Sequence, residues 1–306
     1  MRRSTFSKDK EKIHRDGLTE ALRAGYSLLE EGYPALDAVE AAIRTLEDNP
    51  LFNAGKGAVF THDRKNELDA SIMDGRSLKA GAVGSVTIIK NPITAARLVM
   101  EQSPHVFLTG KGAETFAKKM KLPLVKNSYF ATQVQLDDLK KVQAREKAIE
   151  EKLKRHPNAK ASPHQPTKLG TVGAVAIDYL GNIAAGTSTG GTVNKRYGRV
   201  GDTPLIGAGT YAKNGVVGIS ATGDGEYFIR AVAAHEIAAL MEYKGYSLER
   251  AQKEVIHHRV GKLGGTGGVI GIDSTGKIAM NFNTPGMYRG WVGADGKINT
   301  AIFGKS

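Results

Sequence analysis

The sequence predicts an α+β fold in which helices and sheets form separate layers. Strand-like segments and helical segments each occur in runs along the chain, and this arrangement is typical of α+β proteins. The chain has 306 residues, of which 41% are hydrophobic, so it can bury the core of one large domain or two modest ones. Its 37 glycines and few aromatic residues also suit sheets that pack closely against other backbone.

Helical periodicity dominates the start of the chain. Apolar residues recur at helical spacing over residues 7–32 and again over 35–47, and Pro50 ends the second pattern. The segment LFNAGKGAVF then predicts a glycine-punctuated loop, and ELDASIMDG and AGAVGSVTII predict strands. NPITAARLVMEQS predicts a helix with Asn91 as its cap and Pro92 at its first position.

The composition changes over residues 119–170, which are charged and rich in proline. We interpret this stretch as a polar linker that contains one short helix over 137–154. It is the strongest candidate for an organisational boundary in the chain.

Sheet-forming patterns return after the linker. TVGAVAID and NIAAGTSTG predict two strands joined by the turn YLGN, and GVVGISATGDGE predicts a third. EYFIRAVAAHEIAALMEYKG predicts one long helix, and SLERAQKEVIHHRVG a further helix that Ser247 caps. GGVIGIDSTG and KIAMNFNT predict the last two strands.

The composition excludes several classes of chemistry. The absence of cysteine rules out disulfides, thiolate metal sites and a cysteine nucleophile. The net charge of +12 suggests nucleic-acid binding, but the basic residues cluster in helix-face and linker segments without interleaved aromatics, so we favour solvated charge and expect no nucleic-acid partner. No run of eighteen apolar residues predicts a membrane span, and the first residues lack the apolar run of a secretory signal. We therefore expect a cytoplasmic protein.

No catalytic cofactor is expected. GAGTYA lacks the third glycine of a dinucleotide-binding fingerprint, and TGKGA lacks the hydroxyl residue that completes a P-loop. The histidines show no metal-binding spacing.

The junction between Gly170 and Thr171 is the remaining candidate for chemistry. Cleavage of this bond would make Thr171 an amino terminus, and its α-amine, with a reference pKa of roughly 8, could deprotonate its own hydroxyl. Nucleophile and base would then share one residue, and glycine would permit the strained conformation that self-cleavage requires. For an isolated Gly-Thr pair, however, a strand threonine after a turn is the favoured interpretation.

The sequence around this junction favours the catalytic interpretation. GTVGAVAIDYLGNIAAGTSTGGTVNKRYGRVGDTPLIGAGTYA closely resembles the plant-type L-asparaginase/isoaspartyl peptidase family of N-terminal nucleophile hydrolases. The resemblance continues through ISATGDGEYFIRAVAAHEIAALM and NFNTPGMYRGW, and upstream through LEDNPLFNAGKGAVF, ELDASIMDG and NPITAARLVMEQSPHV. It covers nearly the whole chain from about Asp16 onward.

The resemblance implies a four-layer αββα sandwich made as an inactive precursor. Self-cleavage before Thr171 would give an α part, residues 1–170, and a β part, residues 171–306, which together form one domain. The usual assembly is a dimer of such αβ units. Specific roles are also implied: Thr171 as nucleophile, Thr189 as a supporting hydroxyl, Arg199 and Asp202 as ligands of the substrate α-carboxylate and α-ammonium, Thr222 and Gly223 at the oxyanion, and Asn53 as a contributor from the α part.

A structural sodium ion is a further implication of the resemblance. Its ligands would be main-chain carbonyls in the loop from residue 46 to 56. Carbonyl oxygens suit a hard cation of this kind. The carbonyls implied are those of Leu46, Glu47, Asn49, Phe52, Ala54 and Lys56.

The first residues depart from the family pattern. Family members begin with an apolar strand that runs into a His-Gly-Gly-Ala-Gly segment, whereas this chain begins MRRSTFSKDKEKIHRDGL. We therefore expect the sandwich without its usual first strand, with two exposed strand edges and uncovered core.

The first hypothesis for function is an amidohydrolase of L-asparagine and β-aspartyl dipeptides that forms a β-aspartyl acyl-enzyme. Within the same fold, a glycosylasparaginase or a threonine endopeptidase is the near alternative. An uncleaved, catalytically silent protein that still binds aspartate-like groups is an alternative from another class. Nucleic-acid binding ranks last.

Overall fold

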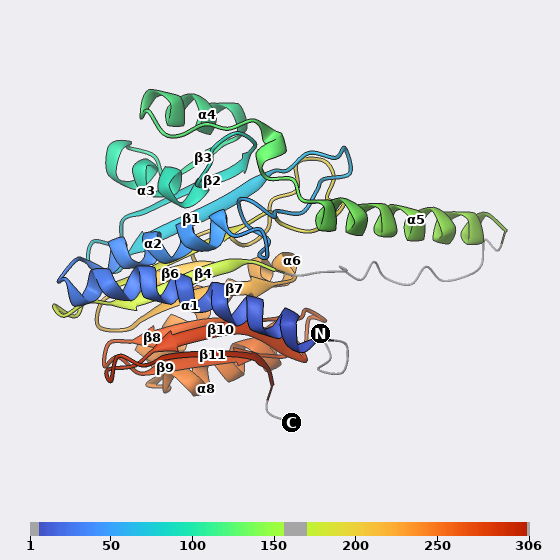
Figure 1. Ribbon diagram of the computed structural model, residues 1–306. Helices are drawn as coiled ribbons and strands as arrows, with labels where there is room; N and C mark the ends of the chain where they lie inside the picture. Colours follow the sequence, from blue (N-terminus) through green and yellow to red (C-terminus); the bar gives the residue numbers. More distant parts are fainter. Residues whose placement is uncertain (1–5, 156–169, 305–306) are drawn as a thin grey trace.

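The computed structural model describes residues 6–155 and 170–304, which form a mixed α+β structure (Figure 1). Its largest sheet has five strands in the order β3-β2-β1-β5-β4, antiparallel except for the parallel β2–β3 pair. The strands of this sheet are β1 (Leu68–Asp74), β2 (Ala80–Val86), β3 (Phe107–Thr109), β4 (Val172–Ile177) and β5 (Ile183–Thr189). The chain therefore contributes three strands from before residue 119 and two from after residue 170.

Two further sheets come from the C-terminal half. One has four antiparallel strands in the order β6-β7-β8-β9, and the other is the antiparallel pair β10-β11. Their strands are β6 (Thr210–Lys213), β7 (Val217–Gly223), β8 (Gly267–Asp273), β9 (Ile278–Phe282), β10 (Gly286–Val292) and β11 (Ile298–Phe303). The sequence patterns predicted β7, β8 and β9 but not β6, β10 or β11.

The predicted N-terminal helices are confirmed. They are α1 (Lys8–Glu30), α2 (Ala35–Asp48) and α3 (Pro92–Gln102), the last with proline in its first turn. Helix α2 packs on the five-stranded sheet, because a side chain at Gly186 in β5 would lie within 3.0 Å of Val39 and Ile43. Helix α4 (Gly110–Lys119) follows β3, and the sequence analysis did not predict it.

The stretch interpreted as a polar linker is partly packed. It includes the 3-10 turn Asn127–Tyr129, and Phe130 beside it is fully buried. Helix α5 (Gln133–Arg155) starts earlier than predicted and extends away from the body of the molecule (Figure 1). Its buried residues are Gln135, Leu139 and Val142, all in its first three turns. Residues 156–169 of the linker lie outside the described residues.

The prediction of a single long helix after β7 is wrong, because the segment forms two helices that are separated at Val232. Val232 adopts a left-handed conformation with φ of 47°, which ends α6 (Gly225–Ala231) and starts α7 (Ala233–Lys244). Helical periodicity cannot detect this break, because valine rarely adopts a positive φ and its presence therefore does not signal one. Helix α8 (Leu248–Lys253) begins at Ser247, whose hydroxyl accepts from the Arg250 N–H as expected, and it continues as a π-helix over Glu254–Val260.

Buried hydroxyl groups join the five-stranded sheet to the four-stranded sheet. Thr187 Oγ1 in β5 lies 2.6 Å from Thr210 Oγ1 in β6 and 2.7 Å from Ser220 Oγ in β7. Ser71 in β1 also donates to Thr210, at 2.8 Å. These hydroxyls satisfy one another where no water enters, and they fix the end of β5 relative to β7.

Helix length and polarity argue against one class of structure. Within residues 6–155 and 170–304, no helix combines the length and apolar character that crossing a membrane requires.

Close contact between β2 and α3 generates a stability prediction. A Cβ atom at Gly81 would lie 2.0 Å from the Ala96 carbonyl oxygen and 2.6 Å from the Met100 nitrogen, both backbone atoms that cannot rotate away. Gly81→Ala should therefore lower the free energy of unfolding by about 1–3 kcal/mol, measured by urea denaturation. Gly112→Ala in α4 is the matched control, since nothing lies within 4 Å of its Cβ position. Equal stability of the two variants would contradict this packing.

Candidate active site

Thr171 stands immediately before β4 and points its hydroxyl at the end of β5. Thr171 Oγ1 donates to Thr189 Oγ1 at 3.1 Å. The antiparallel register sets this distance, because Val172 pairs with Ser188 and the preceding residue therefore falls opposite Thr189. Thr171 is half-buried and Thr189 is buried.

Thr189 links the nucleophile candidate to the peptide bond before it. Its hydroxyl donates to the Gly170 carbonyl at 3.3 Å and accepts from the Gly191 N–H at 3.0 Å. A hydroxyl has one proton to donate and two lone pairs to accept, so these two bonds and the one from Thr171 use it fully. Thr189 is thus hydrogen-bonded both to the Thr171 hydroxyl and to the carbonyl oxygen of the Gly170–Thr171 peptide bond.

Asn53 holds the N-terminal part of the chain against the end of β5. Its Nδ2 donates to the Gly191 carbonyl at 2.8 Å, and its backbone carbonyl accepts from the Gly190 N–H at 3.1 Å. Its Oδ1 accepts from the Val59 N–H at 2.9 Å. Asn53 therefore fixes the position of the Gly190–Gly191 loop, which follows Thr189.

Arg199 is oriented by a carboxylate that the sequence analysis missed. Its Nε and Nη2 donate to Glu226 Oε1 and Oε2, each at 2.9 Å, which is the paired fork geometry of a guanidinium and a carboxylate. Hydrogen bonds from Arg199 lower the pKa of Glu226. Only Nη1 is left outside this fork.

Asp202 lies close to Arg199 and is buried. Its side chain comes from a residue only 5% exposed, and its Oδ2 has no hydrogen-bond partner among the described residues. Burial raises the pKa of Asp202 to about 7, and the charge of Arg199 offsets this effect in part. A buried carboxylate oxygen without a partner is a strong acceptor for a cationic ligand.

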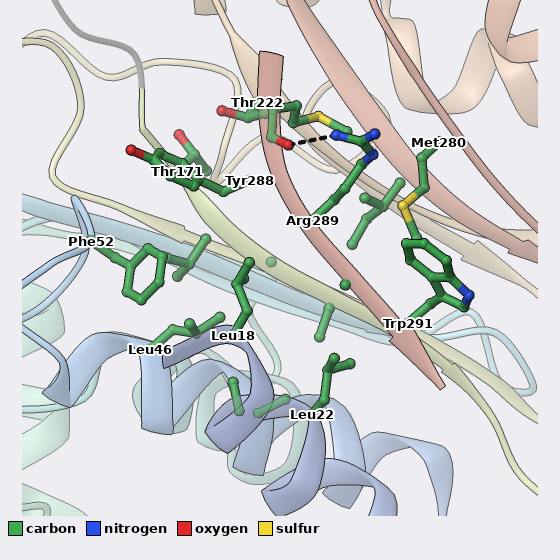
Figure 2. Close-up of a pocket in the computed structure, with 18 of the residues that line it drawn as sticks. Leu18, Leu22, Leu46, Phe52, Thr171, Thr222, Met280, Tyr288, Arg289 and Trp291 are labelled. Atoms are coloured by element: carbon green, nitrogen blue, oxygen red, sulfur yellow. Dashed lines mark hydrogen bonds between the residues drawn. The ribbon is translucent and has the colours of Figure 1, made fainter. Parts of the chain in front are cut away.

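Thr222 and Gly223 end β7 beside Thr171. A Cβ at Gly223 would lie 2.5 Å from Phe228 and 2.6 Å from the Thr266 carbonyl oxygen, so only glycine fits there. Figure 2 shows Thr171 and Thr222 at one end of a larger cavity, which is lined mainly by apolar side chains and also by Arg289.

Residues far apart in the sequence therefore meet at one place. A small cavity of about 10 Å³ adjoins Thr171, with room for roughly one water molecule. Thr222 and Asn53 line the larger cavity next to it. The predicted residues that line the small cavity are Gly170, Thr171, Thr189, Arg199, Asp202 and Gly223.

A buried lysine beneath this cavity was also missed by the sequence analysis. Lys195 Nζ donates to the Glu67 carbonyl at 3.0 Å, and a Cβ at Gly191 would lie 3.1 Å from it. Burial lowers the pKa of Lys195, while Asp69 and Glu67 oppose that change. A lysine in the segment TVNKRYGRV carries no sequence signal for burial, since lysine is usually solvated. Glu226 likewise follows a glycine in a helix start, where an acidic residue is common.

The loop expected to hold sodium borders the site through Asn53. Gly55, with φ of 47°, folds the loop back so that the Lys56 N–H donates to the Glu47 carbonyl at 2.7 Å. The Glu47 side chain is buried, accepts from Ser188 Oγ at 2.6 Å, and has its pKa raised to about 8 by burial. Its other carboxylate oxygen, Oε2, has no hydrogen-bond partner among the described residues.

Comparison with known proteins identifies the family. Residues 1–302 match the family described as asparaginase. The chain is 49% identical to an isoaspartyl peptidase of Escherichia coli over 98% of this chain and 92% of that protein. It is 48% identical to a putative isoaspartyl peptidase/L-asparaginase of Dictyostelium discoideum, over 95% of this chain and 89% of that protein. It is 43% identical to an isoaspartyl peptidase/L-asparaginase of Homo sapiens, over 97% of this chain and 92% of that protein.

The site thus places Thr171, directly before β4, in one small cavity with Arg199 and the buried Asp202. The chain belongs to the asparaginase family.

The raised pKa of Asp202 generates a prediction about stability and pH. The folded protein must hold this carboxylate charged and buried above about pH 7, whereas in the unfolded chain it ionises near its ordinary value of 3.8. The resulting penalty is full above pH 7 and is lost as pH falls toward 4. Asp202→Asn should therefore raise the melting temperature at pH 8 by several degrees more than at pH 4.5, measured by calorimetry.

An exposed carboxylate serves as the control for that comparison. Asp63→Asn removes one negative charge from the surface. A stability gain at pH 8 equal for both variants would show that net charge, and not burial of Asp202, causes the effect.

Proposed function

We propose that the protein hydrolyses L-asparagine and β-aspartyl dipeptides with Thr171 as an N-terminal nucleophile. One observation carries this proposal: the Thr171 hydroxyl is hydrogen-bonded to Thr189 in a cavity shared with Arg199 and Asp202. The names of the relatives, isoaspartyl peptidase and L-asparaginase, support the same substrates.

Maturation begins with attack of Thr171 Oγ1 on the carbonyl carbon of Gly170. The C–N bond breaks as the acyl group moves from nitrogen to oxygen, and the hydroxyl proton passes to the released amine. Water then hydrolyses the ester, which frees the Gly170 carboxylate and restores the Thr171 hydroxyl. The hydrogen bond from Thr189 to the Gly170 carbonyl supports this step, because it stabilises negative charge that develops on that oxygen.

Turnover uses the α-amine that cleavage releases. This amine takes the proton of Thr171 Oγ1 as the oxygen attacks the side-chain carbonyl of the substrate. Thr222 and Gly223 stabilise the oxyanion, and as it collapses the α-amine passes its proton to the leaving nitrogen, which departs as ammonia or an amino acid. Water then hydrolyses the β-aspartyl ester. Both substrates fit one site because they differ only in the leaving amine.

Substrate recognition rests on two charges. The free Nη1 of Arg199 is available for the α-carboxylate, and Asp202 Oδ2 is available for the α-ammonium. The cavity of about 10 Å³ in the continuous chain is too small for asparagine, and Gly170 forms part of its lining, so cleavage after Gly170 would open it.

Three broader features belong to the same proposal. The sheets and covering helices make up a four-layer αββα sandwich, cut into residues 1–170 and 171–306. Two such αβ units form the active assembly. Carbonyls of the loop over residues 46–56 hold a structural sodium ion that takes no part in the reaction.

The nucleophile generates the first prediction here. Thr171→Ala removes the hydroxyl needed for both steps, so the purified protein should remain one chain and release ammonia from asparagine at least about a thousandfold more slowly. Intact-mass spectrometry and an ammonia assay measure the two results.

Thr115→Ala, on the exposed face of α4, is the matched control and should behave like wild type. Cleavage of Thr171→Ala at the bond after Gly170 would reject the role of Thr171. Intact wild-type protein that binds aspartate without turnover would instead favour a silent binding protein.

The fork between Arg199 and Glu226 generates a second prediction. Arg199→Ala should lower kcat/KM roughly 30- to 5,000-fold, because the substrate carboxylate loses its partner. This fall corresponds to a loss of about 2–5 kcal/mol of transition-state stabilisation. Glu226→Gln should raise KM about fivefold and change kcat little, since this half-exposed carboxylate only orients the guanidinium. Glu249→Gln on α8 is the control. An equal fall in kcat for Glu226→Gln, with KM unchanged, would contradict the positioning role.

The sodium loop generates a third prediction. Replacing choline chloride by sodium chloride at equal ionic strength should raise the melting temperature by about 1–3 °C, because bound cation stabilises only the folded loop. Gly55→Ala should remove this difference, since its Cβ would lie 2.3 Å from the Glu47 carbonyl oxygen. A sodium effect that survives in this variant would place the ion elsewhere.

A further inference from the structure

We propose that Glu146, near the middle of α5, is a positioning residue for substrate binding. It fixes residues 194–202, the segment that carries Arg199 and Asp202. We call this segment the clamp arm. Arg199 and Asp202 hold the substrate head group in the proposed function, on which this role of Glu146 rests. Glu146 precedes the cleavage site and the clamp arm follows it, so in the cleaved protein this contact joins two separate chains.

Glu146 binds the first residues of the clamp arm through one carboxylate oxygen. Its Oε2 accepts from Asn194 Nδ2 at 2.7 Å and from Arg196 Nη2 at 2.9 Å. The Glu146 side chain is only 19% exposed, so water and salt screen this ion pair less than a fully exposed one. The two donors are two residues apart, and one carboxylate therefore holds the clamp arm at two points.

The part of α5 that carries Glu146 is itself anchored beside the clamp arm. Gln143 Nε2 donates to the His62 carbonyl at 3.0 Å, one turn before Glu146. The same turns of α5 contribute to a small apolar core between the helix and the clamp arm. Its buried residues are Val59, Phe60, Leu139, Val142 and Val193. Glu146 thus stands on the docked half of α5, before the half that extends away from the molecule (Figure 1).

The clamp arm contains a turn that its own side chains do not stabilise. The Arg199 N–H donates to the Arg196 carbonyl at 3.0 Å, and Tyr197 and Gly198 between them have φ of 59° and 67°. Positive φ at both central residues is typical of a type I′ turn, which tyrosine adopts unfavourably. Tyr197 is fully exposed, so its side chain adds no packing. Contacts at the two ends of the turn must therefore hold it in place.

Two carboxylates from different elements bind these ends. Glu146 in α5 binds Arg196 at the first position of the turn, and Glu226 in α6 binds Arg199 at the fourth. Among the described residues, Arg199 lines the small cavity beside Thr171 and Arg196 does not. A substrate in that cavity would therefore meet Arg199 and leave the pair of Arg196 and Glu146 intact. Glu146 thus holds the turn while Arg199 binds the substrate carboxylate.

A second anchor fixes the start of the clamp arm but not its turn. Lys195 is buried, its Nζ donates to the Glu67 carbonyl at 3.0 Å, and its own carbonyl accepts from the His62 N–H at 2.9 Å. These bonds lie before the turn over residues 196–199. Loss of the Glu146 carboxylate should therefore loosen the turn without unfolding the clamp arm, and it should affect substrate binding more than the chemical step.

The experiment compares Glu146→Ala with Glu150→Ala, a matched control one turn further along α5 on its exposed surface. Glu146→Ala should raise KM for L-asparagine about three- to tenfold and change kcat by less than about twofold. Its melting temperature should fall by no more than about 3 °C, since one partly exposed ion pair contributes little to stability. Glu150→Ala should match the wild-type protein in all three measurements. Rates are expressed per cleaved molecule, counted by intact-mass spectrometry, so that a change in maturation does not alter them.

Hydrogen exchange reports the clamp arm without any turnover. Backbone amides of residues 196–202 should exchange at least about threefold faster in Glu146→Ala than in the wild-type protein, because the turn opens more often. The same amides of Glu150→Ala should exchange at the wild-type rate.

A double variant tests whether Glu146 acts through Arg196. Arg196→Ala should raise KM less than Glu146→Ala does, because Asn194 keeps its bond to the carboxylate. Glu146→Ala combined with Arg196→Ala should have the KM of Glu146→Ala alone, since the bond from Arg196 is already lost. A KM equal to the product of the two separate effects would show that the residues act independently and would contradict the proposal.

Three other results would overturn the role of Glu146. They are an unchanged KM in Glu146→Ala, a fall in kcat with KM unchanged, and clamp-arm exchange at the wild-type rate in this variant. Failure of the proposed function has a different signature, which is a wild-type protein that releases no ammonia from asparagine. Faster exchange of the clamp arm in Glu146→Ala would in that case still show that Glu146 fixes it.

Discussion

The antiparallel pairing of β4 with β5 is the constraint on which the rest of the site depends. It sets Thr171 opposite Thr189, and the hydroxyl of Thr189 in turn reaches the Gly170 carbonyl. The same strand β5 is held on its other side by β1 and beneath by the hydroxyls of Thr187 and its neighbours. A shift of one residue in this register would turn each of these side chains to the opposite face.

Asp202 and Arg199, which lie near that pairing, differ in their burial and in their charged partners. Asp202 is buried, and its Oδ2 has no hydrogen-bond partner among the described residues, whereas Arg199 already has an anionic partner in Glu226. The exposed side of the fork can yield to a competing carboxylate at small cost, because half-exposed ion pairs contribute little to stability. Asp202 differs, because burial of its charged form costs stability above about pH 7. In the function proposed above, recognition of an amino-acid head group would combine one rigid contact, from Asp202, with one adaptable contact, from Arg199.

Within the described residues, β4 is an edge strand that joins Thr171 to a partly uncovered region of the core. Apolar side chains of α1, β9 and β10 stay partly exposed around a cavity of about 1210 Å³, although they belong to core-forming elements. This cavity and the environment of Thr171 are physically linked, because Thr171 lines the cavity and β4 begins directly after it.

The sequence by itself determined most elements, since local periodicity and caps report helices such as α1 to α3 and strands such as β4, β5 and β7. It also determined which residues were candidates for the site, because GTVGAVAID and GRVGD stand in long family motifs. Only the tertiary structure decided the break at Val232, the short strands β3 and β6, and the fork between Arg199 and Glu226. These features arise from contacts between distant segments, and neither a side chain's partner nor its burial is encoded in local periodicity.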